Sequence, residues 1–271
     1  MYPYWWCGFL DAYPGFDAWT LLFRKVKDAA WFSMTNDLQL TKEKDSVRPH
    51  WSRELVEICV FIFLILPSMV LSFFVVRQGG LSFRLVAFGT IARDSGLVCL
   101  ILYFLWRNNE PLYWIGWTLK SAWGEAVLGL GLFIPFFLVV GVSESALRAA
   151  GFSFPSTPLP SYLAAKGAPE LILAFILVGV VAVAEETIFR GYLVLRVRAL
   201  TASPTAAVLL SAFIFSLGHG YEGSAGVVTV GIMGVVFALV YLWRQSLIAP
   251  IVMHFLQDFA GIVLLPVLGK G

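Results

Sequence analysis

The sequence predicts an all-α protein, a polytopic membrane helix bundle of about seven to eight transmembrane helices. Of its 271 residues, 59% are hydrophobic and only 13% are charged, against roughly 25% charged residues in an average soluble domain. The apolar residues gather in long stretches, and about 20 consecutive apolar residues suffice to cross the hydrocarbon layer. Ionisable residues nevertheless recur inside the last of these stretches. Burying a charged side chain in the membrane is energetically unfavourable, so its presence there indicates a function. We therefore expect an integral membrane protein with a buried polar site.

Seven apolar stretches are candidate spans. They run over about residues 55–76, 85–106, 123–143, 170–195, 204–219, 225–243 and 247–267. An eighth, short or re-entrant piece is possible in the Pro-rich stretch 152–169. The second span contains Arg93 and Asp94, which we interpret as an ion pair within the bundle or an interruption of the helix rather than as a catalytic pair.

The first 54 residues differ from the rest, which divides the chain into an N-terminal segment, 1–54, and a transmembrane bundle, 55–271. The segment holds seven Lys or Arg and many aromatic residues. Its apolar residues between Phe16 and Ala30 recur at helical spacing, with basic residues toward the other side. This pattern is typical of an amphipathic helix on the membrane surface. An aromatic-rich cap packed on the protein is the alternative.

Basic residues near the span ends indicate how the bundle is oriented. With the N-terminus in the cytoplasm, twelve Lys and Arg lie on the cytoplasmic side and five on the other side. The positive-inside rule therefore favours a cytoplasmic N-terminus. The net charge of +2 is too small to indicate a nucleic-acid partner.

The first polar motif, Glu185-Glu186-Thr-Ile-Phe-Arg190, lies in the fourth span. Glu186 and Arg190 are four residues apart with the acid nearer the N-terminus, the orientation in which such a pair forms most readily. The pair offsets much of the cost of burying both charges. Glu185 is then about 100° away around the helix without an assigned partner, and is the candidate general base.

Two further motifs follow on the next polar helices. Phe215 and His219 share one face of the fifth span, and His254 and Asp258 share one face of the last. Only three histidines exist in the chain, and two of them fall in these motifs. Together with the first motif, they indicate a catalytic site rather than isolated core histidines.

The turn between the fourth and fifth spans gives a geometric check. Glu185 and His219 are equidistant in sequence from residue 202, in the predicted turn Ala202-Ser203-Pro204. An antiparallel helix pair would therefore place them at similar depth, facing each other. The same count places His254 at the depth of Glu185 and His219 only if its helix tilts or begins deeper in the bundle.

The ordered trio EExxxR, FxxxH and HxxxN/D on successive membrane helices resembles the CPBP intramembrane protease family. This family includes the type II CAAX prenyl endopeptidases and bacterial proteins of the immunity and lysostaphin-resistance kinds. The resemblance covers about residues 165–265. It implies an endopeptidase that hydrolyses peptide bonds of membrane-associated substrates within the membrane, prenylated CAAX-type peptides being the substrates of its eukaryotic members. The implied partners are membrane lipid and a membrane-associated protein or peptide.

The resemblance also implies a role for each motif residue. Glu185 and His219 would hold and deprotonate the attacking water, and His254 and Asp258 would stabilise the oxyanion. An Asn at the last position donates a hydrogen bond directly, whereas Asp258 donates only if protonated and otherwise orients His254. Structural support would come from the remaining motif residues, Glu186, Arg190 and Phe215.

A metal-dependent mechanism is an open alternative. Glu185, His219 and His254 can supply the three ligands of an open zinc site, but the HExxH spacing is absent. A glutamate and two histidines can also activate water unaided. We therefore expect that no cofactor is required, with a divalent metal such as zinc as the alternative.

Two other functions stay open: a non-proteolytic scaffold or bacteriocin-immunity-type protein, and a proton or ion transporter.

Overall fold

The computed structural model describes residues 51–75, 82–154 and 163–268. The predicted amphipathic helix lies outside these residues, and so do residues 155–162 of the stretch 152–169, where an eighth piece was considered. Within the described ranges every regular element is a helix, which confirms the predicted all-α class.

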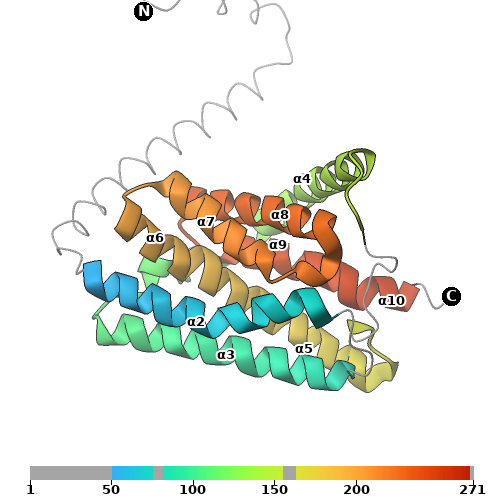
Figure 1. Cartoon of the computed structure of the whole chain (residues 1–271), viewed down its shortest axis with the longest axis horizontal. Coiled ribbons are helices and arrows are strands. Elements are labelled where there is room, and N and C mark those ends of the chain that lie inside the picture. The colour runs from blue at the N-terminus through green and yellow to red at the C-terminus, as the bar shows by residue number, and fades with distance from the viewer. Residues whose placement is uncertain (1–50, 76–81, 155–162, 269–271) are drawn as a thin grey trace, which may run out of the picture. The chain divides into compact units, whose positions relative to one another are not determined.

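Seven helical segments follow one another in the described part of the chain, each at one of the predicted spans (Figure 1). They are α2 (Trp51–Val75), α3 (Phe83–Arg107), α4 (Ala122–Ala149), α5 (Gly167–Glu185) continued by the π-helical turn η3 (Glu186–Leu193) and α6 (Val194–Thr201), α7 (Pro204–Leu217), α8 (Gly223–Arg244), and α9 (Ile248–Asp258) continued by the π-helical turn η5 (Phe259–Leu264) and α10 (Leu265–Leu268). Two short 3₁₀ turns, η1 (Leu112–Ile115) and η4 (Gly220–Glu222), precede α4 and α8.

Four helical segments of the described residues are long and apolar enough to cross a membrane, namely Phe83–Arg107, Ala122–Ala149, Gly167–Thr201 and Gly220–Arg244. Pro204–Leu217 and Ile248–Leu264 are shorter apolar helices. This composition is that of an integral membrane protein.

The reversal between α6 and α7 lies at the predicted turn. Ala202 takes a left-handed backbone conformation, with φ of 53°, and ends α6. Ser203 then caps α7, since its hydroxyl accepts the N–H of Ala206 at 3.2 Å, and Pro204 occupies the first helical position. Both features are typical of a helix start.

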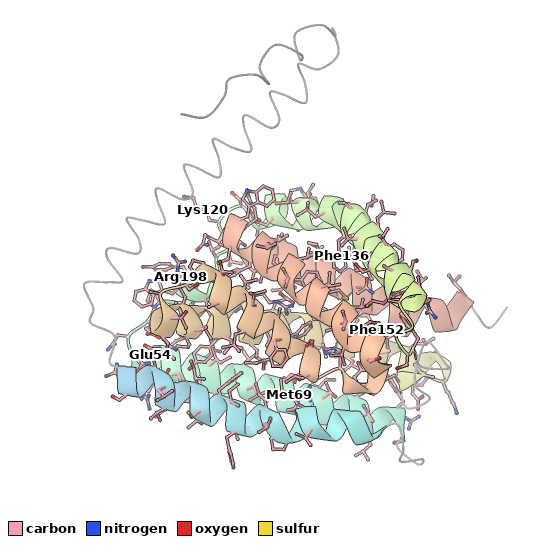
Figure 2. The ribbon with its side chains drawn as sticks, turned by 45° about the horizontal axis from the view of Figure 1, so that its top comes forward. Glu54, Met69, Lys120, Phe136, Phe152 and Arg198 are labelled. Atoms are coloured by element: carbon pink, nitrogen blue, oxygen red, sulfur yellow. The ribbon has the colours of Figure 1, made fainter. Side chains whose placement is uncertain are left out.

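The helices pack in pairs that bring the fourth and last spans together. α3 and α9 both pack on α5, α4 packs on α9, and α7 packs on α6 and α8. Figure 1 shows α2 and α3 side by side along one edge of this bundle. α4 contains Pro135 and bends near the middle, beside Phe136 (Figure 2).

Two glycines allow the close approaches that position α9 and η3. A Cβ at Gly129 of α4 would lie 2.8 Å from the carbonyl oxygen of Ala249, and a Cβ at Gly191 of η3 would lie 2.7 Å from that of Ile115. At the same place the N–H of Leu247 donates to the carbonyl of Gly116 at 3.1 Å. The start of α9 is therefore fixed deep in the bundle, where Leu247 and Ala249 are fully buried.

One end of the bundle carries the features of a membrane interface. Glu54, Lys120 and Arg198 lie at this end, and Phe152 lies at the other (Figure 2). Large exposed aromatic side chains occur next to it, at the end of α3 and the start of α4: Trp106, Tyr113 and Trp123. Aromatic and basic residues together are typical of the boundary between hydrocarbon and water.

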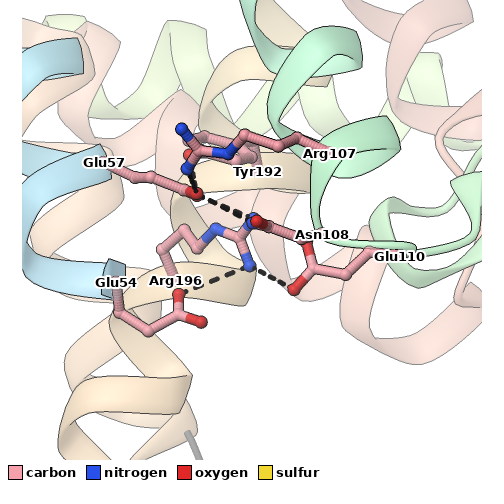
Figure 3. A network of polar contacts seen from close by, with 7 residues as sticks. All are labelled: Glu54, Glu57, Arg107, Asn108, Glu110, Tyr192 and Arg196. Atoms are coloured by element: carbon pink, nitrogen blue, oxygen red, sulfur yellow. Dashed lines mark hydrogen bonds and ion pairs between the residues drawn. The ribbon is translucent and has the colours of Figure 1, made fainter. Parts of the chain in front are cut away.

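A buried polar network, which we call the Arg196 network, lies at this end (Figure 3). Arg196 donates two hydrogen bonds to Glu110, at 2.8 and 2.6 Å, and forms ion pairs with Glu57 at 3.0 Å and Glu54 at 3.3 Å. Glu57 also accepts hydrogen bonds from Tyr192, Arg107 and Asn108. The network therefore joins α2, the end of α3, η3 and α6.

Candidate active site

His254 is the centre of the polar cluster that the motifs predict. Its Nδ1 lies 2.8 Å from Oε1 of Glu186. Its Nε2 lies 3.7 Å from Oε2 of Glu185 and 3.5 Å from Oδ2 of Asp258. One imidazole ring therefore faces three carboxylates, two from the junction of α5 and η3 and one from the end of α9.

The predicted pair of Glu186 and Arg190 is confirmed. The two side chains are fully buried, and Nη1 of Arg190 donates to Oε1 of Glu186 at 2.9 Å. The guanidinium lies over the ring of Phe215, 4.2 Å from its centroid, and over that of Phe237 at 5.2 Å. Aromatic faces stabilise a desolvated cation, so this pair forms a closed, electrostatically compensated floor beneath His254.

Phe215 holds both histidines as well as the arginine. Its ring lies 5.0 Å from that of His219 and meets that of His254 edge-on at 6.0 Å. Its carbonyl oxygen lies 3.2 Å from Nδ1 of His219. With Nδ1–H donating to this carbonyl, the neutral imidazole keeps its lone pair on Nε2, as a proton acceptor. The spacing of the second motif thus fixes the histidine tautomer.

His219 does not pair directly with Glu185. Within the described residues the two side chains form neither an ion pair nor a hydrogen bond, and Nδ1 of His219 faces the carbonyl of Phe215 instead. The count assumed two regular helices, whereas α7 ends at Leu217, so His219 lies beyond its end. His254 is the direct partner instead, because α9 meets the condition of a deeper start.

The site is closed on one side and open on the other. Glu186 and Arg190 are fully buried, whereas the side chains of Glu185 and Asp258 are 13% and 22% exposed. The Oε2 atom of Glu185 accepts no hydrogen bond from the described residues. The atom is itself buried, so it is an acceptor without a hydrogen-bond partner beside the imidazole of His254.

α3 contributes an acid that we interpreted as part of a structural pair. Arg93 and Asp94 do form the predicted ion pair, with Nε and Oδ1 2.7 Å apart. Asp94 is only 2% exposed, and its charge reaches both His254 and Glu185. A charged pair in mid-helix was the signal in the sequence, but the spacing did not connect it to motifs about 90 residues away.

The π-helical turn η3 is the local feature that the sequence analysis missed. It begins at Glu186 and contains Arg190, and all its residues are buried. Such wide turns within α-helices occur frequently at functional sites. The hydrophobic periodicity of the span is too continuous to reveal the extra residue.

A metal site would need at least three suitable ligands in one place. Among residues 51–75, 82–154 and 163–268, no group of three His, Cys, Asp or Glu side chains is arranged to hold a metal ion, although three carboxylates surround His254. His254 directs Nδ1 at Glu186, and within the described residues His219 forms no ion pair with Glu185. The residues of the zinc alternative therefore do not form a ready ligand set.

Comparison with known proteins agrees with the motifs. Residues 167–260 match the family described as Type II CAAX prenyl endopeptidase Rce1-like, and this range contains all three motifs. Neither the curated proteins nor the solved structures contain a significant match to the chain. Residues 167–260 are therefore similar to the Rce1-like type II CAAX prenyl endopeptidase family, the kind of family that the order of the three motifs predicted.

Proposed function

We propose that the protein is an intramembrane endopeptidase that hydrolyses membrane-associated substrates with a water activated by Glu185 and His219. One observation carries this proposal. Oε2 of Glu185, which is buried and has no hydrogen-bond partner among the described residues, lies 3.7 Å from Nε2 of His254, next to the buried pair of Glu186 and Arg190. A candidate base, an imidazole and the partly exposed side chain of Asp258 thus meet inside an apolar bundle.

The attacking water lies between Oε2 of Glu185 and Nε2 of His219 in this mechanism. Its oxygen adds to the scissile carbonyl carbon while its proton passes to Glu185. The resulting intermediate collapses with cleavage of the C–N bond, and the leaving amine takes the proton. Each residue needs only to be within hydrogen-bond reach of the group that it serves.

His254 is the proposed donor to the oxyanion. When doubly protonated, its ring donates from Nδ1 to Glu186 and presents Nε2–H toward the open side, next to Asp258. A fixed donor aimed at the developing charge lowers the barrier without reorganisation. In this scheme Asp258 orients His254 and does not itself donate.

A cavity near the site supports a lipid-modified substrate. Its volume is about 380 Å³, and it lies between α2, α6 and α7. The surface that lines it is apolar and includes Ile62, Met69, Val197, Ile214 and Leu217. Its lining ends at Leu217, two residues before His219. We propose that it receives the isoprenoid chain of a prenylated CAAX-type peptide, so that the peptide bond lies near Glu185.

The test is hydrolysis by the full-length protein in lipid vesicles. Prenylated CAAX-type peptides and their unmodified forms are incubated with the wild type and with Glu185→Gln, and products are identified by mass spectrometry. We expect cleavage of the prenylated peptide by the wild type alone. Equal product from both proteins, or none from either, would refute the proposal. A scaffold role would survive Glu185→Gln, and a transporter would move protons or ions without product.

A further inference from the structure

Ser211 of α7 makes an unusual hydrogen bond to the catalytic helix. Its hydroxyl is 1% exposed and donates to the carbonyl oxygen of Phe189, in η3, at 2.7 Å. The same carbonyl accepts the N–H of Val194, five residues on, which is the bond type of a π-helix. Ser211 therefore contacts a carbonyl that also accepts a hydrogen bond of the π-helical kind.

Hydroxyls in helices usually bond within their own helix. Ser216, in the same α7, follows this rule and donates to the carbonyl of Phe213 at 2.8 Å. Thr187 and Thr201 likewise donate to carbonyls four residues back. Ser211 departs from the rule, since its only acceptor among the described residues belongs to a neighbouring helix.

The wide turn decides which way the two halves of its helix face. An α-helix advances about 100° per residue, and a π turn accommodates one extra residue. The extra residue rotates everything after η3 by about one such step relative to everything before it. Before the turn, Glu185 reaches His254 in α9. After it, Arg196 reaches Glu57 in α2.

Both facings cannot be kept if η3 relaxes to an ordinary α-helix. The Arg196 network holds the second half through several buried contacts (Figure 3). The first half, which carries Glu185 and Glu186, would therefore rotate away from His254. A second hydrogen bond to the carbonyl of Phe189 opposes this rotation, because a buried hydroxyl without its acceptor is unfavourable.

We propose that Ser211 is a positioning residue of the proteolytic site: its hydroxyl holds η3 in the π register that directs Glu185 and Glu186 at His254. The expected effect on kcat rests on the proposed function. The claim that Ser211 holds the π register of η3 does not depend on that function, since the register can be measured without a substrate.

The experiment compares four full-length proteins in lipid vesicles: the wild type, Ser211→Ala, Ser211→Thr and Ser216→Ala. Ser216→Ala is the matched control, because it removes a buried hydroxyl of the same helix whose bond is local. The measurements are kcat and KM on a prenylated CAAX-type peptide, thermal unfolding, and hydrogen exchange of residues 186–196 by mass spectrometry.

We expect Ser211→Ala to lower kcat by about tenfold, the equivalent of one lost hydrogen bond in the transition state, with KM nearly unchanged. Exchange in residues 186–196 should rise in this variant alone. Ser211→Thr keeps the hydroxyl and should restore both quantities, which a packing effect would not do. Ser216→Ala should resemble the wild type.

Three results would overturn the inference. One is a Ser211→Ala protein with wild-type kcat and exchange, and another is an equal loss in Ser216→Ala. The third is a folded Ser211→Thr protein without recovery, and this variant decides the matter if Ser211→Ala does not fold. If the wild type is inert but exchange changes as expected, the proposed proteolysis fails while the role of Ser211 in the turn stands.

Discussion

The Nδ1 atom of His254 lies 2.8 Å from the carboxylate of Glu186, which also accepts from Arg190. One buried carboxylate oxygen thus links the last polar motif to the first. The imidazole of His254 is held by the same acid that neutralises the buried arginine.

Replacing Glu185 by Gln should abolish peptide hydrolysis. The amide keeps the shape of the side chain but cannot accept a proton from water, and general-base catalysis contributes about 10²–10⁴-fold to the rate. The measurement is kcat in vesicles, beside the thermal unfolding temperature. Glu170→Gln is the control, because Glu170 pairs with Arg84 at the start of α5, away from His254. A similar loss in both variants would contradict a specific role for Glu185.

Replacing Glu186 by Gln should destabilise the protein. Arg190 would remain fully buried without its charge partner, and breaking a buried ion pair in this way costs about 3–5 kcal/mol. The aromatic faces of Phe215 and Phe237 place the expected loss near the lower value. The double variant Glu186→Gln, Arg190→Met should recover part of the stability. Additive losses in this cycle, measured by denaturation in detergent, would exclude the coupling.

Asp258 should tolerate Asn better than Ala. If Asp258 orients His254 through Nε2, 3.5 Å away, an amide oxygen can replace the carboxylate oxygen. We expect Asp258→Asn to keep kcat within about tenfold and Asp258→Ala to lose about a hundredfold, since oriented donors to an oxyanion contribute on that order. Equal losses in the two variants would show that the negative charge itself is needed.

The Arg196 network should contribute to stability rather than to chemistry. Tyr192→Phe removes one hydrogen bond to Glu57, and we expect a loss of about 1 kcal/mol. Arg196→Met leaves the carboxylates of Glu54, Glu57 and Glu110 without their shared cation and should cost several times as much. Denaturation in detergent measures both. Tyr192→Phe should keep the wild-type KM, and a rise in KM would place substrate at this end of the bundle.

Filling the apolar cavity should act on prenylated substrates alone. Ile214→Trp adds a large ring between α2, α6 and α7 and should raise KM for a prenylated peptide without changing cleavage of an unmodified one, if any occurs. Leu209→Trp is the control, since Leu209 is an exposed residue of the same helix outside the cavity. Equal KM values for both variants would place the lipid chain elsewhere.

A chelator should leave activity intact if Glu185 and His219 activate water without a metal. The assay is hydrolysis before and after treatment with a strong chelator of divalent ions, followed by single added metals. Loss of activity that zinc alone restores would establish the metal-dependent alternative. The ligand set would then have to form by movement of His219 toward Glu185.

The sequence predicted what depends on spacing within one helix. The pair of Glu186 and Arg190 and the shared face of His254 and Asp258 both follow from neighbours four residues apart. The turn at Ala202–Pro204 follows from its residue types. The order of the motifs, rather than any one of them, indicated the family.

Contacts between helices were harder to predict. They depend on how each helix is rotated about its axis and how deep it lies in the bundle, and the sequence of one helix does not determine either. The extra residue in η3 does not change the apolar pattern of the sequence. The sequence also does not indicate that Gly129 allows α9 to pack closely against α4. Glu57 in the first span and Arg196 after the fourth are far apart in the sequence. Only the packed structure shows that they neutralise each other.

The closed floor and partly exposed upper side of the site have a kinetic consequence. Among the described residues of the cluster, Glu185 and Asp258 are reached by solvent, whereas Glu186 and Arg190 are not. If the proposed proteolysis takes place, water and peptide enter from the side of Glu185 and Asp258, and a cleaved fragment that stays there blocks both. Turnover would be limited by the departure of the fragment that keeps its lipid, so slow-leaving analogues of that fragment should be effective competitive inhibitors.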